Sequence, residues 1–172
     1  GQTLDTFSEG YYIIKSVAFN SDGKLLAFNN SEKIIVWDIQ NKKSYLNPLI
    51  GNDEQVTILK FFPDNNQLIS GGEDHRVLIW DLKTGNLVQE AKNGHTDWTQ
   101  KLAVSSEYNI IATGGKDPTI ILWDLQSGRQ LATLILPIRG EFLNNLVFSP
   151  DGRKLATSVY TPSRGESKIF LW

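Results

Sequence analysis

The hydrophobic positions of this chain form short continuous runs that end on tryptophan and are separated by turn-forming residues. Four such runs lie at residues 34–37, 77–80, 119–123 and 168–172. Because they are rich in Val, Ile and Leu and do not alternate with polar residues, they predict strands that are buried on both faces. Helical spacing appears nowhere convincingly, so we predict an all-β fold.

Further strands are predicted on both sides of each tryptophan run. Two shorter apolar segments precede each run, at residues 17–19 and 25–28, 59–61 and 67–70, 102–104 and 110–113, and 146–148 and 154–157. The connection between these segments is rich in turn formers such as Pro150 and Gly152, since proline presets φ and glycine tolerates the left-handed conformation. A fourth strand is predicted after two of the runs, at 86–91 and 129–136.

The same unit recurs with a fixed period. The dipeptide Trp-Asp occurs at residues 37–38, 80–81 and 123–124, each 43 residues after the last. A period in this range indicates an array of one supersecondary unit, in which each copy buries its apolar face on its neighbours. Four short antiparallel strands with this period describe one blade of a β-propeller. We therefore expect four units, at approximately residues 1–42, 43–85, 86–128 and 129–172.

In its period, its Trp-Asp strand ends and the dipeptide Gly94-His95, the chain resembles the WD-repeat β-propellers over its whole length. The resemblance implies that blades often carry a hydrogen-bonded tetrad of His, Ser or Thr, Asp and Trp, since a buried indole N–H and a buried imidazole need partners. One unit carries all four residue types, at His95, Thr113, Asp117 and Trp123.

The other three units depart from the tetrad. The second unit keeps Ser70, Asp74 and Trp80 but has Asn52 at the histidine position, and the first unit loses the set. The last unit has Thr157 but carries Arg139 where the histidine would stand.

The first residues bear on how the array closes. Gly1 falls at the same repeat position as Gly85 and Gly128, so residues 2–7 are predicted to form an outer strand. The resemblance implies that such a strand completes the last blade. Three arrangements stay open: a part of a larger propeller, which we favour because the chain contains no Met; two copies paired in an eight-bladed ring; or a chain that closes alone.

Composition narrows the functional classes. Lys plus Arg number 17 against 19 for Asp plus Glu, so no basic excess indicates a nucleic-acid partner. Cysteine is absent, and no apolar run approaches the roughly 18 residues needed to span a bilayer. Without a signal-peptide pattern at the start, we expect a cytoplasmic protein with no membrane partner.

No reactive constellation is indicated. The two histidines, His75 and His95, fall at different repeat positions, and without cysteine they predict no metal site. Gly114-Gly115-Lys116 precedes a predicted strand and lacks the spacing of a phosphate loop, so we interpret it as a tight turn and expect no cofactor. A His95–Asp117 pair resembles half of a catalytic triad, but its place in the tetrad favours a framework role.

The resemblance implies that loops on one face of the propeller bind protein partners. The residues here with side chains typical of binding hot spots are Tyr12, Arg76, Trp98, Arg139, Phe142, Tyr160 and Arg164. The last unit is also longer, with 49 residues from Trp123 to Trp172, and residues 159–166 are predicted to enlarge a loop on the same face. The alternatives are a core-capping role for Phe142 and a tolerated surface insertion.

We therefore predict a non-enzymatic protein–protein interaction scaffold, or a regulatory or sensor module of a larger protein. Its partners would be a protein or peptide, together with further blades or a second copy of the chain. The alternatives are a catalytic propeller with a site at the central channel and a purely architectural half-propeller.

Overall fold

The computed structural model describes residues 6, 13–91, 94–137, 142–162 and 164–172, and these residues form fifteen strands in four antiparallel sheets. Sheet 1 contains β1 (Val17–Phe19), β2 (Leu25–Asn30), β3 (Lys33–Asp38) and β4 (Lys43–Ser44). Sheet 2 contains β5 (Val56–Phe61), β6 (Gln67–Gly72), β7 (Val77–Asp81) and β8 (Leu87–Ala91). The all-β prediction is confirmed.

The other two sheets follow the same order. Sheet 3 contains β9 (Thr99–Ser105), β10 (Ile110–Gly115), β11 (Thr119–Asp124) and β12 (Gln130–Ile135). Sheet 4 contains β13 (Phe142–Phe148), β14 (Leu155–Thr161) and β15 (Glu166–Leu171). Within each sheet the strands are neighbours in chain order, so every sheet is a meander, as in a propeller blade.

The tryptophans of the repeat occupy equivalent positions in the four sheets. Trp37, Trp80 and Trp123 lie opposite Leu26, Leu68 and Ile111 on the preceding strand. Trp172 exchanges backbone hydrogen bonds of 2.9 and 3.0 Å with Leu155, which is the same register. The fixed spacing in the sequence therefore corresponds to a fixed position in each sheet.

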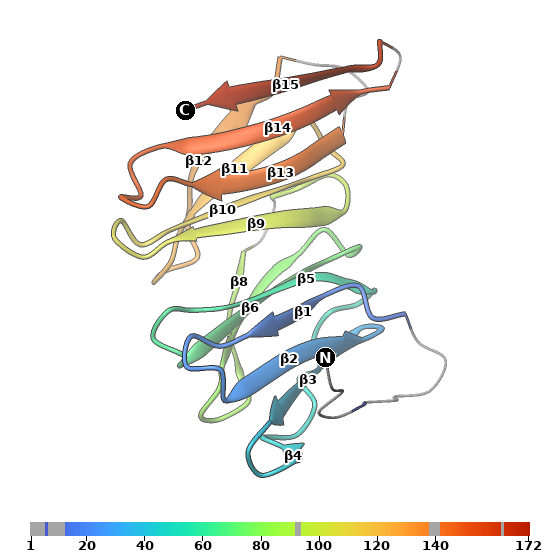
Figure 1. Cartoon of the computed structure of the whole chain (residues 1–172), viewed down its shortest axis with the longest axis vertical. Coiled ribbons are helices and arrows are strands. Elements are labelled where there is room, and N and C mark those ends of the chain that lie inside the picture. Colours follow the sequence, from blue (N-terminus) through green and yellow to red (C-terminus); the bar gives the residue numbers. More distant parts are fainter. Residues whose placement is uncertain (1–5, 7–12, 92–93, 138–141, 163) are drawn as a thin grey trace, which may run out of the picture.

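The four sheets lie in an open row (Figure 1). Their first strands, β1, β5, β9 and β13, contact one another in sequence, and sheets 1 and 4 lie at opposite ends of the molecule. An apolar core cluster fills each of the three joints between adjacent sheets; Leu78, Ile79 and Ile120 are typical fully buried members, one from each joint. Closure of the chain on itself is thus not the arrangement in this structure.

Sheet 4 differs from the others at its outer edge. Its described part has three strands, and the predicted outer strand at residues 2–7 lies outside the described residues. The prediction that the last tryptophan run is buried on both faces is wrong, because most side chains of β15 are exposed. The apolar pattern of β15 matches that of β3, β7 and β11, but no further sheet packs against it in the described part of the chain.

The extra residues of the last unit lengthen a hairpin. The expected enlargement of a loop over residues 159–166 is wrong, because β14 continues to Thr161 and β15 begins at Glu166. Tyr160 pairs with Ser167, and Thr161 with Glu166, so that only residues 162–165 connect the strands. Backbone pairing therefore takes up the insertion, and the hairpin extends beyond the ends of the equivalent hairpins.

Candidate functional site

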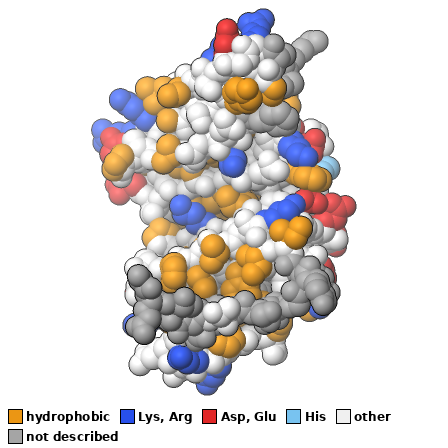
Figure 2. Space-filling view, turned by 45° about the vertical axis from the view of Figure 1, so that its right-hand side comes forward, with side chains coloured by type: hydrophobic (Ala, Val, Ile, Leu, Met, Phe, Trp, Pro, Cys, Tyr) orange, Lys and Arg blue, Asp and Glu red, His pale blue; other side chains and the backbone are white. Residues whose placement is uncertain are grey.

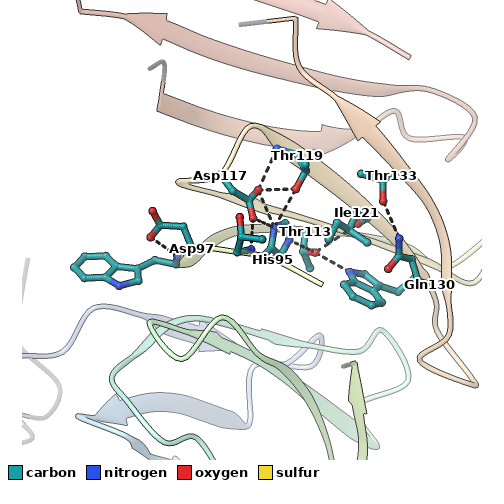
Figure 3. Close-up of polar contacts among 11 residues, drawn as sticks. His95, Asp97, Thr113, Asp117, Thr119, Ile121, Gln130 and Thr133 are labelled. Atoms are coloured by element: carbon teal, nitrogen blue, oxygen red, sulfur yellow. Dashed lines mark hydrogen bonds and ion pairs between the residues drawn. The ribbon is translucent and has the colours of Figure 1, made fainter. Parts of the chain in front are cut away.

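The four residues of the predicted tetrad form one hydrogen-bonded chain in sheet 3 (Figure 3). The indole N–H of Trp123 donates to the Thr113 hydroxyl at 2.7 Å, and that hydroxyl lies 2.8 Å from His95 Nε2. His95 Nδ1 lies 2.9 Å from a carboxylate oxygen of Asp117. Because an ionised carboxylate only accepts, Nδ1 donates to it, and in the neutral ring Nε2 accepts from Thr113.

Asp117 is the terminal anchor of this chain. Besides His95, it accepts hydrogen bonds from the backbone N–H of Thr96 and from the hydroxyl and N–H of Thr119, at 2.8, 2.6 and 3.0 Å. Burial raises the pKa of Asp117, but the hydrogen bonds from His95 and Thr119 outweigh burial and lower this pKa from 3.8 to about 2. The carboxylate therefore stays ionised down to strongly acidic pH.

This lowered pKa predicts an acid-dependent loss of stability. A carboxyl whose pKa is lower in the folded than in the unfolded protein contributes stability above the unfolded value, and loses it as the pH falls through the folded value. For Asp117 that window lies between about pH 4 and pH 2. We expect Asp117→Asn to be destabilised at neutral pH and to lose less further stability than the wild type across this window. Thermal unfolding followed by circular dichroism at several pH values measures the difference.

The control for this experiment is Glu107→Gln, which changes a carboxylate in an exposed turn and should keep the wild-type pH dependence. If wild type and Asp117→Asn lost stability in parallel between these pH values, the assignment of Asp117 as the anchor would be contradicted.

The tetrad is a framework element. The side chains of His95 and Asp117 are 0% and 3% exposed, and His95 Nε2 is occupied by a hydroxyl that also receives the indole N–H. A general base needs an open position beside its acceptor nitrogen, and this histidine has none. The pair therefore orders sheet 3 and its adjoining loops.

Sheet 2 builds the same chain with an amide in place of the imidazole. Trp80 donates to the Ser70 hydroxyl at 2.9 Å, Ser70 donates to Asn52 Oδ1 at 3.0 Å, and Asn52 Nδ2 donates to Asp74 at 3.1 Å. An amide carries an acceptor oxygen and a donor nitrogen on the same carbon. A neutral imidazole likewise carries the acceptor Nε2 and the donor Nδ1–H on either side of one carbon. The substitution that the sequence presents as a loss thus preserves the connection.

Glycine precedes His95 and Asn52 because the backbone there lies against the indole ring. A Cβ on Gly94 would lie 2.5 Å from Cη2 of Trp123, and one on Gly51 would lie 2.7 Å from Cη2 of Trp80. The Gly-His dipeptide of the repeat is thereby explained by close packing as well as by hydrogen bonding.

The first and last sheets lack the complete chain of hydrogen bonds in the described part of the protein, and their buried polar residues are placed differently. In sheet 1, buried Asn29 accepts from the N–H groups of Lys15 and Ser16 at 2.9 Å and donates to the carbonyl of Ile13. In sheet 4, the buried hydroxyl of Thr157 has no hydrogen-bond partner among the described residues. Arg139, predicted near this position, lies outside them.

Trp98 is the predicted partner-binding residue with the most distinctive surroundings. It lies in the loop before β9, half-buried, with Lys116 Nζ 3.2 Å and Lys15 Nζ 5.4 Å from its ring centroid. Lys15 also forms an ion pair with Glu73. Ammonium groups are attracted to the face of an indole, so the ring and the two lysines hold one another in place. We call Lys15, Glu73, Trp98 and Lys116 the Trp98 cluster.

The cluster is assembled by loops of three sheets. Lys15 precedes β1, Glu73 follows β6, and Trp98 and Lys116 flank β9 and β10. The backbone N–H of Lys116 donates to the carbonyl of Trp98 at 3.1 Å, which ties the two loops of sheet 3 together. Among the described residues, no carboxylate forms an ion pair with Lys116. The lysines and Glu73 were not among the residues predicted to bind a partner.

Arg76, in contrast, is engaged within the molecule. Its guanidinium donates to Glu90, to Asp53 and to the carbonyl of Gly51, each at 2.8 Å. Burial lowers the pKa of Arg76, but the hydrogen bond and charge of Glu90 outweigh burial and raise it. The geometry therefore favours a structural role for Arg76 over partner binding.

The remaining predicted residues are placed only in part. Tyr160 is exposed on β14, opposite Phe142 of β13, and Arg164 is exposed in the turn before β15. Tyr12 lies outside the described residues. The backbone pairing thus places Phe142 opposite Tyr160 on one hairpin.

Two further kinds of feature are absent from the described residues. No group of three or more His, Asp or Glu side chains is arranged to hold a metal ion. No helix in the described part of the chain is long and apolar enough to cross a membrane.

Comparison with known families identifies the repeat. The family model described as "WD domain, G-beta repeat" matches residues 43–81 and 85–124. The first match contains the whole Asn52–Ser70–Asp74–Trp80 chain of hydrogen bonds, and the second contains the whole His95 tetrad. A search of curated proteins found no match to the chain. The family signature and the two complete hydrogen-bonded chains therefore coincide.

Proposed function

Since this chain belongs to the WD-repeat proteins, whose repeats in general form non-catalytic protein-interaction scaffolds, we propose that it binds a protein partner through the Trp98 cluster. We propose more specifically that the partner presents an acidic peptide segment, and that the chain acts as a scaffold or regulatory module for it. The framework residues of the repeat are buried, so the recognition residues must come from the loops.

The Trp98 cluster is the observation that supports this proposal. Tryptophan is among the side chains most enriched at binding hot spots, and a half-buried ring held by two cations is already ordered before a partner arrives. Lys116 is available for a charge-assisted hydrogen bond to a carboxylate, and Lys15 shares its charge with Glu73. An acidic side chain next to an apolar one would satisfy both the lysine and the indole.

Selection from a random peptide library tests the proposal without knowledge of the natural partner. We expect the selected peptides to be enriched in Asp and Glu, and Trp98→Ala to weaken their binding roughly thirty-fold, which corresponds to a hot-spot contribution of about 2 kcal/mol. Lys116→Glu is expected to abolish the preference for acidic peptides, because the new carboxylate repels them. Fluorescence polarisation with labelled peptides measures the affinities.

Tyr45→Ala is the matched control, since Tyr45 is an exposed aromatic residue just after β4 and outside the cluster. It should leave peptide affinity unchanged. Equal affinity of the wild type and Trp98→Ala for the selected peptides would rule out this surface, and selection of peptides without acidic residues would contradict the proposed partner chemistry.

A further inference from the structure

The outermost faces of the row of sheets are apolar and exposed. On sheet 4, Ile169 and Leu171 of β15 are 78% and 67% exposed; on sheet 1, Val17 and Phe19 of β1 are 61% and 64% exposed. Figure 2 shows hydrophobic side chains gathered at the height of β1 in Figure 1. Contiguous exposed apolar side chains of this kind indicate an interaction surface. We call the two surfaces the sheet 4 end face and the sheet 1 end face.

The register of the strands shows what covers the equivalent of the sheet 4 end face elsewhere. Ile169 lies opposite Ser158, one residue after Thr157. The same position is held by Ile34, Val77 and Ile120 in sheets 1 to 3, where each side chain is 2% exposed or less. In each case the side chain is buried against the following sheet.

The sheet 1 end face has equivalents on the opposite side of each joint. Val17 lies opposite Phe28, just as Leu59, Leu102 and Leu146 lie opposite Ser70, Thr113 and Thr157. These three leucines are no more than 7% exposed and are buried against the preceding sheet. Phe19 likewise corresponds to Phe61, which lies in the joint between sheets 1 and 2.

Each internal joint therefore combines two different faces, and in the described part of the chain the row ends on one unpaired face of each kind. We propose that the sheet 4 end face packs on the sheet 1 end face of a second copy of the chain, and that two such joints close a ring of eight sheets. The contact is head-to-tail, so it must either close into a ring or continue as a filament. Two copies give eight blades, within the known range of about four to eight, and a third copy would exceed it.

The residues of the proposed joint, on β1 and β15 at the two ends of the row, are different from the four residues of the Trp98 cluster. Its apolar side chains alternate along each strand as they do at the three internal joints, so packing needs no rearrangement of either sheet. Burial of these side chains would remove strongly exposed apolar groups of both terminal sheets from water.

Solution mass tests the proposal directly. At micromolar concentration, sedimentation equilibrium is expected to give twice the 19.3 kDa of one chain. The double variants Val17→Glu/Phe19→Glu and Ile169→Glu/Leu171→Glu each break one face and are expected to be monomeric. Leu131→Glu places the same charge at an exposed position of β12, outside both faces, and should keep the dimer. Circular dichroism checks that every variant is folded.

A mixture of the two double variants distinguishes head-to-tail contact from other pairings. Each variant keeps the face that the other has lost, so the mixture retains one intact joint. We expect the two variants to associate with each other, about a hundredfold more weakly than the wild type, because the second, intramolecular joint is missing.

A monomeric wild-type chain at micromolar concentration would overturn the proposal, since another polypeptide would then be required to cover the end faces. Persistent dimers of either double variant alone would show that identical faces pair. Lack of association in the mixture would equally overturn the head-to-tail contact. None of these results depends on peptide binding at the Trp98 cluster.

Discussion

Replacing Gly115 with alanine is expected to lower the free energy of unfolding by about 3 kcal/mol and to displace Trp98. A Cβ on Gly115 would lie 1.8 Å from the carbonyl oxygen of Trp98 and 3.1 Å from Cα of Thr99. The colliding atoms belong to the backbone, so no side-chain rotation can relieve the contact. Gly115 lies at an irregularity in the pairing of β9 with β10, where the register shifts between Gly114 and Gly115.

The same change should also affect the Trp98 cluster. The hydrogen bond from Lys116 N–H to the Trp98 carbonyl starts one residue away from the collision, so any shift of Trp98 moves its ring relative to Lys116 Nζ. We therefore expect the affinity for acidic peptides to fall together with stability. Urea unfolding and peptide titration on the same preparation measure the two effects.

Gly165→Ala is the appropriate comparison. Gly165 has a φ of +65° in the turn between β14 and β15, and a Cβ on this residue would have no atom within 4 Å. The substitution there should cost only about 1 kcal/mol, from backbone strain alone, and leave peptide affinity unchanged. A cost at Gly115 no greater than at Gly165 would contradict the close approach described above.

The centres of the strands could be predicted from the sequence, because burial on both faces demands continuous apolar residues. Their ends could not. The predicted strand at 102–104 extends over Thr99–Ser105, and the one at 154–157 extends to Thr161. Strand ends are held by backbone hydrogen bonds, which are available to polar residues such as Thr99 and Tyr160 and therefore leave no hydrophobic signal.

The residues of the candidate site also fall into those that the sequence predicts and those that it does not. His95, Thr113 and Asp117 were predictable because their residue types and spacing match the repeat. Asn52 was not, since its equivalence to a histidine depends on where its amide oxygen and nitrogen point. The lysines beside Trp98 were also missed, because loops of different sheets bring Lys15 next to a ring 83 positions further along the sequence.

The exposure of side chains at the end of the row likewise cannot be predicted from the local pattern of apolar residues in the sequence. Ile169 and Ile120 occupy equivalent positions in equally apolar strands, and only the presence of a neighbouring sheet decides which one is buried. The role of Arg76 also depends on distant segments. A surface arginine resembles a binding residue in the sequence, but Glu90 and Asp53 come from two other segments and form ion pairs with Arg76.

The tryptophans of the repeat are expected to differ sharply in their contribution to stability, although the sequence makes them equivalent. Trp80 and Trp123 are each 1% exposed, and each donates its indole N–H to a buried hydroxyl. Alanine at either position leaves a large cavity beside Gly51 or Gly94 and should cost about 3–5 kcal/mol. Trp172 is 39% exposed, so alanine there should cost only about 1 kcal/mol.

Urea unfolding followed by far-ultraviolet circular dichroism measures these differences. The background should be the Val17→Glu/Phe19→Glu variant, so that association between copies does not contribute to the stability of sheet 4. Because Trp172 lies in the same register as Trp123, its low cost would come from the open outer edge of sheet 4 and not from its place in the repeat. A cost for Trp172 equal to that for Trp123 would mean that its indole is covered in the monomer, which contradicts the open outer edge of sheet 4.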